Sequence, residues 1–376
     1  MRITRVETFP VAPRWLFLKI STDEGIVGWG EPTLENRVHT VAQAIAEVEP
    51  YLLGKDPTRV MHHWQAIYKH AFYRGGPVLT SALSGIEHAL WDIAGKALGV
   101  PVYKLFGGPL RDRIRVYAHI RGDTLAEQIA YVQARKAEGF RAFKTGPRTV
   151  TGQSAHRFIE TPAFVDAVVD RFAALREGAG RDVDIAIDFH GAVSPQMAGT
   201  LIKALEPFQP MFIEEPVQCQ NVDVLADLAR KTHLPIATGE RIFTKWGFRE
   251  ILEKGAASIV QPDISHAGGI FEGRLIAGMA ESYYVLVAPH CPLGPISLAA
   301  GIQLDASIPN FLCQEQVHLG EGYLKQPFVV KDGYIDLPTG PGLGIEIDEE
   351  ALQDKIGVFR RHPGLFHPDD GAAIDH

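Results

Sequence analysis

The first third of the chain changes from a strand-like to a helical pattern of apolar positions. Alternating apolar positions predict an antiparallel meander of three strands, at residues 3–8, 15–21 and 26–31. Helical spacing follows at residues 37–53, 57–71 and 78–98. Gly107-Gly108-Pro109 then interrupts the pattern. The sequence therefore predicts an α+β unit at this end of the chain.

From residue 115 onward, short apolar runs alternate with helical segments. The runs that read as strands are 115–120, 140–145, 184–190, 211–215, 235–239, 258–263, 285–290 and 311–316. The helical segments between most of them are 124–138, 163–177, 196–206, 221–231, 246–254 and 270–281. Such alternation is typical of parallel strands, and eight parallel strands close a barrel. After about residue 320 the alternation stops, and residues 328–347 are predicted to form strand and turn.

The composition is typical of a soluble globular protein. Of 376 residues, 46% are apolar and 22% are charged. The formal net charge is −8 and there is no basic run, so we expect neither nucleic acid nor a membrane as a partner. The N-terminus lacks the apolar core of a signal peptide, and no apolar run approaches ~18 residues, which favours a cytoplasmic protein. Cys219, Cys291 and Cys313 form no CxxC pair and are expected to be reduced.

Charged and polar side chains gather at the ends of the predicted strands. In a parallel barrel the working groups lie at the C-terminal strand ends. Asp188 and His190 share one such end and, being two residues apart, are expected to point to the same face. Together the ends carry Lys144, Asp188, His190, Glu214, Glu240, Asp263, His290 and Glu315.

Three of these acids suggest a metal site. Asp188, Glu214 and Glu240 follow one another at equal intervals of 26 residues, one in each βα unit. Carboxylates without a cysteine among them make an all-oxygen site, which suits Mg²⁺, or Mn²⁺, better than Zn²⁺. The alternative for each acid is an ion pair, such as Glu240 with Arg241. Because all three occupy matching strand ends, we interpret them as metal ligands.

Two histidines are candidates for proton transfer. His290 ends one strand and Asp263 ends the preceding one, so the carboxylate can hold one imidazole nitrogen and raise the basicity of the other. A histidine at a strand end is often only structural, but the acid one strand away favours a base. His190 is expected to face His290 across the barrel mouth, so that one face can lose a proton and the other gain one.

This layout suits removal of a proton α to a carboxylate. The resulting enediolate needs a metal at the carboxylate oxygens. Glu315, if protonated, would donate a hydrogen bond to the same charge, and Lys144 would offer its charge to the substrate or belong to an ion pair. A hydroxyl on the β carbon would leave as water once His190 protonates it. Without that hydroxyl, the outcome would be racemisation or epimerisation.

Six segments carry a family pattern. They are Asp188-Phe189-His190, Phe212-Ile213-Glu214-Glu215-Pro216, Gly239-Glu240-Arg241, Gln261-Pro262-Asp263, Ala288-Pro289-His290 and Gln314-Glu315-Gln316. On these residues the chain resembles the mandelate racemase subgroup of the enolase superfamily, and within it the D-galactonate dehydratases. The resemblance covers essentially the whole chain, including Gly28-Trp29-Gly30-Glu31-Pro32 near the N-terminus.

The resemblance implies a fold and a set of roles. It implies metal ligands at Asp188, Glu214 and Glu240, a base at His290 with its partner Asp263, an acid at His190 and an electrophilic group at Glu315. It also implies a modified (β/α)₇β barrel, residues 113–320, under an α+β capping domain, residues 1–112, to which the segment 321–376 returns. Specificity would come from cap loops whose aromatic and arginine side chains suit a polyhydroxy acid, here Arg14, Trp15, Tyr73 and Arg74. The partners would be an acid sugar and further copies of the chain in a homo-oligomer, often an octamer.

The chain also departs from the family pattern. Racemases of the subgroup have Lys-x-Lys after the second barrel strand, whereas this chain has Phe143-Lys144-Thr145-Gly146. The galactonate dehydratases tend to have an asparagine near Gly146-Pro147-Arg148, and the loop 147–162 carries His156 and Arg157 on no assignable pattern. The missing second lysine favours a dehydratase that relies on histidines.

The sequence thus predicts a Mg²⁺-dependent dehydratase that converts D-galactonate to 2-keto-3-deoxy-D-galactonate and water. Dehydration of another aldonate and epimerisation remain open. A barrel metallohydrolase would need His-x-His on the first strand, where only His119 occurs, and a retaining glycosidase would need a carboxylate in place of His290. A non-catalytic protein that binds sugar acids is the remaining alternative.

Overall fold

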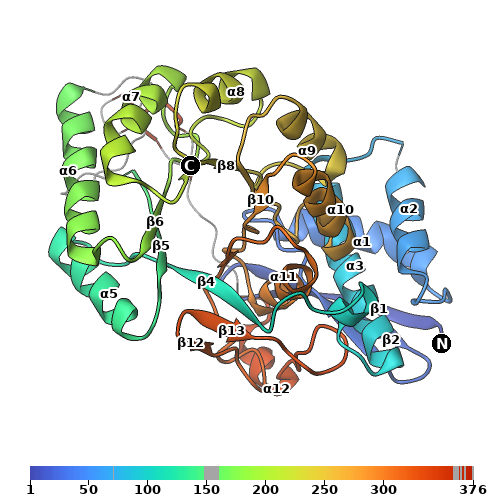
Figure 1. Cartoon of the computed structure of the whole chain (residues 1–376). Helices are drawn as coiled ribbons and strands as arrows, with labels where there is room; N and C mark the ends of the chain where they lie inside the picture. The colour runs from blue at the N-terminus through green and yellow to red at the C-terminus, as the bar shows by residue number, and fades with distance from the viewer. Residues whose placement is uncertain (71, 148–160, 359–363, 365, 368–369, 375–376) are drawn as a thin grey trace.

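A computed structural model describes residues 1–70, 72–147, 161–358, 364, 366–367 and 370–374. Arg148, His156 and Arg157 lie outside these residues, as do parts of the polar C-terminal tail. The described chain forms a small antiparallel sheet with its own helices and a larger sheet that is mostly parallel (Figure 1). None of the helices in this part of the chain combines the length and the apolar character that a bilayer crossing requires.

The N-terminal unit has the predicted order of strands and helices. Its antiparallel sheet consists of β1 (Ile3–Val11), β2 (Trp15–Thr22) and β3 (Val27–Gly30). The helices that follow are α1 (Val38–Leu52), α2 (Val60–His70), α3 (Gly76–Leu98) and α4 (Val102–Leu105). Leu18, Ile45 and Ile86 belong to an apolar cluster that joins the sheet to α1 and α3. This unit therefore has a core of its own.

The larger sheet closes into a barrel. Its strands are β4 (Arg113–His119), β5 (Ala142–Thr145), β6 (Asp184–Asp188), β7 (Ile213–Glu214), β8 (Ile236–Thr238), β9 (Ile259–Val260), β10 (Leu286–Val287) and β11 (Gln314–Glu315). Strands β4 to β10 pair in parallel, each with the next, and β11 pairs in parallel with β4. Phe311, just before β11, forms a parallel bridge with Val287 of β10, which completes the ring.

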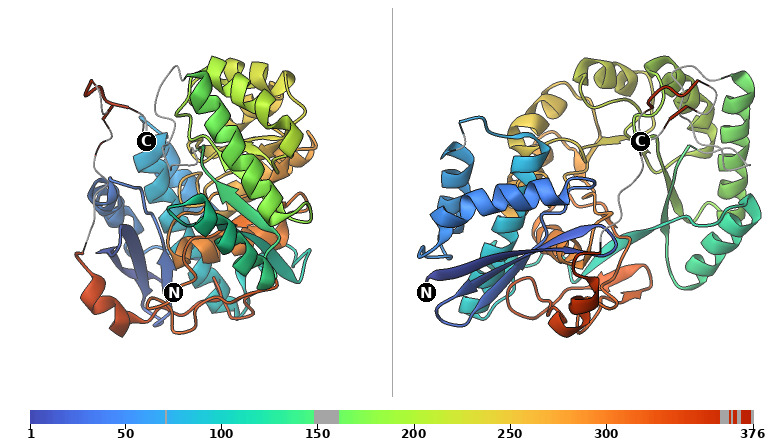
Figure 2. Two further views of the ribbon diagram at one scale, coloured as in Figure 1. Left: turned by 90° about the vertical axis from the view of Figure 1, so that its left-hand side faces the viewer. Right: turned by 180° about the vertical axis from the view of Figure 1, so that it is seen from behind.

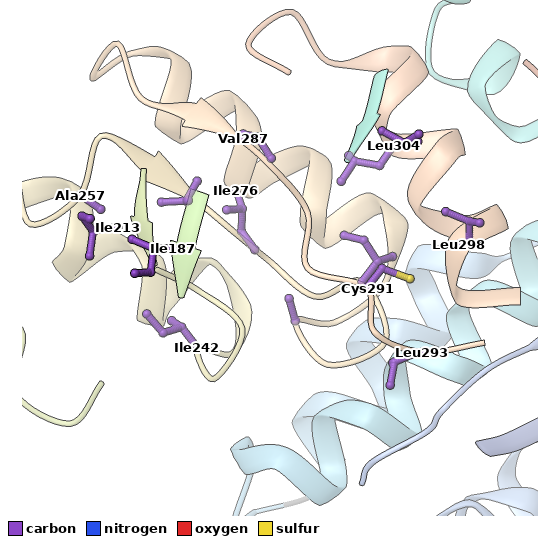
Figure 3. Packing of buried hydrophobic residues seen from close by; sticks show 14 of the residues in the cluster. Ile187, Ile213, Ile242, Ala257, Ile276, Val287, Cys291, Leu293, Leu298 and Leu304 are labelled. Carbon is purple, nitrogen blue, oxygen red and sulfur yellow. The ribbon is translucent and has the colours of Figure 1, made fainter. Parts of the chain in front are cut away.

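A helix follows each of the strands β4 to β10. These helices are α5 (Leu125–Ala137), α6 (Pro162–Ala179), α7 (Pro195–Leu205), α8 (Val222–Arg230), α9 (Thr244–Glu253), α10 (Ile270–Glu281) and α11 (Pro295–Ser307). The order confirms the (β/α)₇β barrel. Outward-facing strand residues such as Ile187, Ile213 and Val287 lie in a large apolar cluster that also contains helix residues such as Ile276 (Figure 3).

Helix α11 was not among the predicted helices. Every residue from Pro295 to Ser307 is buried, so the helix has no polar face and its sequence shows no helical period. It contacts both α4 and β3 of the N-terminal unit. The N-terminal unit lies beside the barrel on the side of α10 and α11 (Figures 1 and 2).

Two layers of side chains fill the barrel. The apolar layer consists of Tyr117, Ala142, Ala186, Phe212, Ala237, Ile259, Ala288 and Cys313. Side chains alternate along a strand, so residues two positions later also point inward, one step nearer the C-terminal ends. We call these residues the polar layer: His119, Lys144, Asp188, Glu214, Gly239, Gln261, His290 and Glu315.

Two carboxylates of the N-terminal unit cap helices of the barrel. Glu87 of α3 accepts hydrogen bonds from the first two backbone N–H groups of α10, at 2.8 and 2.9 Å. Glu31, after β3, accepts from the backbone of Gly294 at 2.7 Å and of Ser297 at 2.9 Å, at the start of α11. Burial raises the pKa of Glu87 to about 8 and that of Glu31 to about 7, although these hydrogen bonds act in the opposite direction. Both contacts fix the unit to the helices on either side of β10.

The C-terminal segment returns to the N-terminal unit. Strands β12 (Val330–Lys331) and β13 (Tyr334–Asp336) form a hairpin that pairs antiparallel with β4, in the region where strand and turn were predicted. Farther on, the backbone N–H of Leu343 donates to Asp92 of α3 at 2.9 Å. Lys19 of β2 contacts Glu349, at the start of α12 (Glu349–Leu352), at 2.6 Å. The exact domain boundaries at residues 112 and 320 stay predictions.

Candidate active site

Asp188 and His190 are brought together by a turn. Strand β6 ends at Asp188, and His190 has a φ of 52°, in the left-handed region. Its backbone N–H donates to Asp188 Oδ1 at 2.9 Å, and its Nε2 lies 3.2 Å from Asp188 Oδ2. The prediction that the strand continues to residue 190 is therefore wrong. The turn instead leaves the imidazole 51% exposed, at the edge of a group of acids, Asp188, Glu214 and Glu240, that we call the acidic cluster.

Glu214 lies beside Asp188 and is bound by a lysine. The two acids are register partners on β7 and β6, and Glu214 is fully buried. Both of its carboxylate oxygens accept from Lys144 Nζ at 3.0 Å. Lys144 Nζ also lies 2.8 Å from Glu315 Oε1 and 3.5 Å from Asp188 Oδ2. Burial opposes a charge on Lys144, but the charges of Glu214 and Glu315 outweigh it and raise the pKa of Lys144 well above its usual value.

Lys144 forms an ion pair in the structure, which is one of the two roles predicted for it; the other is a contact with substrate. Three acids surround its ammonium group, and the side chain is buried. A direct contact between Lys144 and a substrate stays a prediction.

Glu240, just after β8, extends the acidic cluster toward His290. Its Oε2 lies 3.3 Å from His290 Nε2, without hydrogen-bond geometry, and has no hydrogen-bond partner among the described residues. Burial raises the pKa of Glu240. Arg241, the partner in the alternative ion-pair interpretation, lies closer to another acid: its Nε is 2.7 Å from Glu215 Oε2 but 4.0 Å from Glu240 Oε1. Glu240 is thus left available to another ligand.

The cluster fits a hard divalent cation. One ligand atom each from Asp188, His190 and Glu240 lie within 4.8 Å of one another. Glu240 contributes a buried carboxylate oxygen without a hydrogen bond, which is a suitable donor for Mg²⁺. Of the three predicted ligands, the structure groups Asp188 and Glu240 in this way, whereas Glu214 stands next to them in contact with Lys144.

His290 is held by Asp263 from the neighbouring strand end, as the sequence suggested. Its Nδ1 lies 2.8 Å from Asp263 Oδ2, and its Nε2 points toward Glu240. Burial opposes protonation of His290, but the charges of Glu240, Glu315 and Asp263 raise its pKa well above the usual value. The pKa of Asp263 is lowered from its usual value: burial raises it, but His266 and His290 together outweigh burial. Asp263 is therefore an ionised partner of the imidazole.

Asp263 has a second histidine neighbour, which links it to the N-terminal unit. His266 Nε2 lies 3.7 Å from Asp263 Oδ2, and its Nδ1 forms a hydrogen bond of 2.9 Å with Ser81 Oγ on α3. The other carboxylate oxygen, Oδ1, accepts from the backbone N–H of Ser265 at 2.8 Å. The carboxylate is thus fixed from both sides, and α3 contributes to its position.

The role of Glu315 as a hydrogen-bond donor depends on a protonated carboxyl group and stays a prediction, while its surroundings in the structure favour the carboxylate. Three groups surround its carboxylate. Lys144 Nζ lies 2.8 Å away, His119 Nε2 lies 2.7 Å away, and the backbone N–H of Cys291 donates at 2.8 Å. Burial opposes the charge, but Lys144 and His290 lower the pKa of Glu315 well below its usual value. Lys144 and His290 thus favour the carboxylate form of Glu315.

Arg14 and Trp15 lie near the loop after His290 but differ in exposure. Arg14 contacts Glu35 at 2.6 Å and donates to the carbonyl oxygen of Pro292 at 3.0 Å. Trp15 is 2% exposed, and its ring packs against His318 and Tyr323 in the segment after β11, so a substrate contact of Trp15 stays a prediction. A substrate contact of Arg14 stays a prediction.

Tyr73 and Arg74 belong to the loop between α2 and α3. Tyr73 is 86% exposed, and the guanidinium of Arg74 lies 5.5 Å from the centroid of the Tyr68 ring. Within the described residues, no hydrogen bond or ion pair joins either side chain to the polar layer. Contacts of Tyr73 and Arg74 with a substrate stay predictions.

Comparison with known families matches both halves of the chain. Residues 5–107 match the N-terminal domain of mandelate racemase and muconate lactonizing enzyme, and residues 126–351 match the family described as enolase C-terminal domain-like. The chain belongs to the mandelate racemase subgroup of the enolase superfamily. The resemblance inferred from the strand-end motifs is confirmed.

Relatives in the mandelate racemase subgroup include enzymes of named activity. D-galactonate dehydratase from Ralstonia pickettii is 48% identical over 99% of this chain and 100% of the relative. D-galactonate dehydratase from Ralstonia nicotianae is 50% identical over the same shares. This member of the subgroup is accordingly a hydro-lyase, that is, a dehydratase.

Solved structures of the enolase superfamily share the fold. An enolase from Agrobacterium radiobacter, proposed to be a galactarate dehydratase and bound to Na and L-malate, is 32% identical over 100% of both chains, with a TM-score of 0.93. A member of the enolase superfamily from Salmonella Typhimurium is 32% identical over 94% of this chain and 97% of the other, with a TM-score of 0.89.

Two polar-layer residues were not among the site residues predicted from the strand ends. His119 ends β4 and bonds Glu315 at 2.7 Å, and Gln261 follows β9 with its side chain 1% exposed. Both stand two positions after an inward apolar residue, Tyr117 and Ile259 respectively. Extending the alternation by one step along every strand would have found them.

Proposed function

We propose that this protein removes water from D-galactonate to form 2-keto-3-deoxy-D-galactonate, with Mg²⁺ as cofactor. The observation that carries the proposal is the arrangement of His290. Asp263 holds its Nδ1 at 2.8 Å, while its Nε2 lies beside the acidic cluster, 3.3 Å from Glu240. A histidine held in this way presents one nitrogen for proton transfer. The activity of the relatives supports the choice of substrate.

In the proposed first step, His290 Nε2 takes the proton from C2, the carbon next to the substrate carboxylate. The electron pair of the broken C–H bond moves toward C1 and its oxygens, which gives an enediolate. Asp263 accepts the hydrogen bond from Nδ1 and stabilises the imidazolium that forms. Base and positioning carboxylate are therefore assigned to His290 and Asp263.

In the second step, His190 donates a proton to the 3-hydroxyl group. The C3–O bond breaks, the enediolate electrons form the C2–C3 double bond, and water leaves. The resulting enol takes up a proton at C3 to become the 2-keto acid, so the net change is loss of one water. The exposed position of His190 at the edge of the cluster, oriented by Asp188 at 3.2 Å, supports this role.

The cation would be held by Asp188, Glu214 and Glu240. The acids of the cluster and the available oxygen of Glu240 support this assignment. Bound Mg²⁺ would supply positive charge that stabilises the carboxylate oxygens of the enediolate and offsets the acids that raise the pKa of His290. Lys144, 3.0 Å from Glu214 and 2.8 Å from Glu315, favours the carboxylate form of both acids, although burial and Asp188 raise the pKa of Glu214 well above its usual value.

Three sister activities and one non-catalytic role compete with this proposal. The similarity to an enolase proposed to act on galactarate favours including that diacid among the substrates tested. Another aldonate or an epimerisation would use the same base. A non-catalytic protein that binds sugar acids would not depend on the basic nitrogen of His290.

A panel assay tests the proposed reaction. Purified protein with Mg²⁺ is incubated with D-galactonate, other aldonates and galactarate, and formation of a 2-keto-3-deoxy acid is measured. We expect D-galactonate to give the highest kcat/KM and His290→Asn to abolish turnover. His62→Asn, the same change at an exposed helix position, is the control and should leave turnover intact. Rapid deuterium exchange at C2 without a keto acid product would replace dehydration by epimerisation.

Assembly and localisation are part of the proposal. The family resemblance leads us to expect a homo-oligomer, up to an octamer, in the cytoplasm. Light scattering coupled to size-exclusion chromatography would test the oligomer, with a monomer as the contradicting result.

A further inference from the structure

Gln261 occupies a position in the polar layer that the proposed mechanism does not use. Its backbone N–H donates to the carbonyl oxygen of Thr238 at 2.9 Å, so strand pairing between β8 and β9 continues through it. Ile259, two residues earlier, belongs to the apolar layer, whereas Val260 lies in the cluster outside the barrel. The alternation therefore directs the Gln261 side chain into the barrel, at the level of His290.

The Gln261 amide is buried without a hydrogen-bond partner. The residue is 1% exposed, and neither Nε2 nor Oε1 has a partner within the described residues. Other polar-layer side chains are bonded, as Lys144 is to Glu214 and His119 is to Glu315. Buried polar groups are almost always paired, so an unpaired amide between charged residues points to a partner from outside the chain.

The surroundings of Gln261 restrict that partner. On one side β10 leads to His290, and on the other the segment after β8 carries Glu240. Gly239 packs so tightly on Gln261 that a Cβ at Gly239 would lie 2.7 Å from the Gln261 backbone nitrogen. The backbone is thus fixed while the amide stays unsatisfied, next to the residue proposed to take the C2 proton.

We propose that Gln261 binds the substrate directly, beside the carbon at which His290 acts. This inference rests on the proposed function. An amide offers two N–H donors and one acceptor oxygen. Carbons 1 and 2 of an α-hydroxy acid offer carboxylate oxygens that accept and a hydroxyl group that donates. A neutral amide can pair with both without placing another positive charge next to a cation site.

The variant Gln261→Met tests this assignment, because Met has a similar shape but no polar amide. If Gln261 binds substrate, Gln261→Met should lower kcat/KM for D-galactonate by about 10–100-fold, which is the usual effect of losing a hydrogen bond to a charged group. The same variant removes a buried unsatisfied group, so the Tm of the ligand-free protein should equal or exceed that of wild type.

Gln303 provides a matched control. It is also fully buried, but its Oε1 accepts from the backbone of Tyr103 at 3.0 Å and its Nε2 donates to the carbonyl oxygen of Leu343 at 3.0 Å. Gln303→Met should therefore lower Tm and leave KM unchanged. If Gln261→Met instead lowered Tm and left kcat/KM as in wild type, Gln261 would be structural and the proposal overturned.

A second variant and a second readout keep the test decisive. Should Gln261→Met not fold, Gln261→Glu places a negative charge beside the acid substrate and must raise KM; an unchanged KM would overturn the assignment. The order of the ligand-free Tm values of the Gln261 and Gln303 variants does not depend on any substrate. If wild type turned over no acid of the panel, the proposed function would fail. The Tm order would still decide the role of the amide: a Tm of Gln261→Met equal to or above that of wild type would support a binding group, and a lower Tm would overturn it.

Discussion

Replacing Lys144 by methionine should show how much its positive charge stabilises the buried acids around it. Its ammonium group is buried between Glu214, at 3.0 Å, and Glu315, at 2.8 Å, with Asp188 at 3.5 Å. Removing one partner of a buried ion pair usually costs about 3–5 kcal/mol, because the remaining charge stays buried and uncompensated. In EDTA, Lys144→Met should therefore lower the free energy of unfolding by that amount.

Addition of Mg²⁺ should restore part of this loss. A ligand at 100 times its Kd stabilises the folded state by about 2.7 kcal/mol. The variant leaves Asp188 and Glu214 without their cation, so it should bind Mg²⁺ at least about tenfold more tightly and gain roughly a further 1.4 kcal/mol at the same Mg²⁺ concentration. Chemical denaturation with and without Mg²⁺ measures both quantities.

Lys245→Met is the control for this experiment. Lys245 Nζ lies 3.1 Å from the buried Glu272, in an ion pair that does not include the acidic cluster. This variant should be destabilised, yet its response to Mg²⁺ should equal that of wild type. Equal Mg²⁺ responses for wild type and both variants would refute the reasoning, because the acids around Lys144 would then not hold the cation.

Two further changes test the positioning of the base and the docking of the N-terminal unit. Asp263→Asn should lower kcat by about 10²–10⁴-fold with little change in KM, since it removes the carboxylate that supports His290; steady-state kinetics measures this, and a kcat near wild type contradicts it. The pKa of Glu87 is raised by burial to about 8 from 4.5, so its contribution to stability is complete below pH 4.5 and is lost as pH rises through about 8. Glu87→Gln should therefore flatten the pH dependence of unfolding in this range, as urea titrations at several pH values would reveal. If the stability of wild type relative to Glu87→Gln instead increased with pH, the N-terminus of α10 would hold Glu87 ionised.

The strand ends could be predicted because their signal is local. An apolar run that stops at an acid or a histidine marks both the end of a buried strand and a polar group at the barrel mouth. This was enough to propose Asp188, Glu214 and Glu240 as one group and His290 with Asp263 as another. The structure places Asp188 near Glu240 and beside Glu214, and His290 against Asp263, whereas metal binding by the three acids stays a prediction. Helix α11 escaped detection because it is buried on all sides.

The choice of partners could not be predicted from strand ends alone. Lys144 of β5 binds Glu214 of β7, across β6, because the barrel strands bring their inward residues to one level. Trp15 is buried by residues some 300 positions later in the chain, His318 and Tyr323, and no local pattern carries that information. The position of Gln261, in contrast, could have been predicted from the sequence, because strict alternation after Ile259 places it inside the barrel.

The exchange of the C2 proton in D₂O tests the central claim most directly. Wild type, His290→Asn and His190→Asn are each incubated with D-galactonate and Mg²⁺, and NMR follows both the C2 proton and the keto acid product. The account predicts product with wild type, neither exchange nor product with His290→Asn, and exchange without product with His190→Asn. Exchange or product that persists in His290→Asn would contradict it.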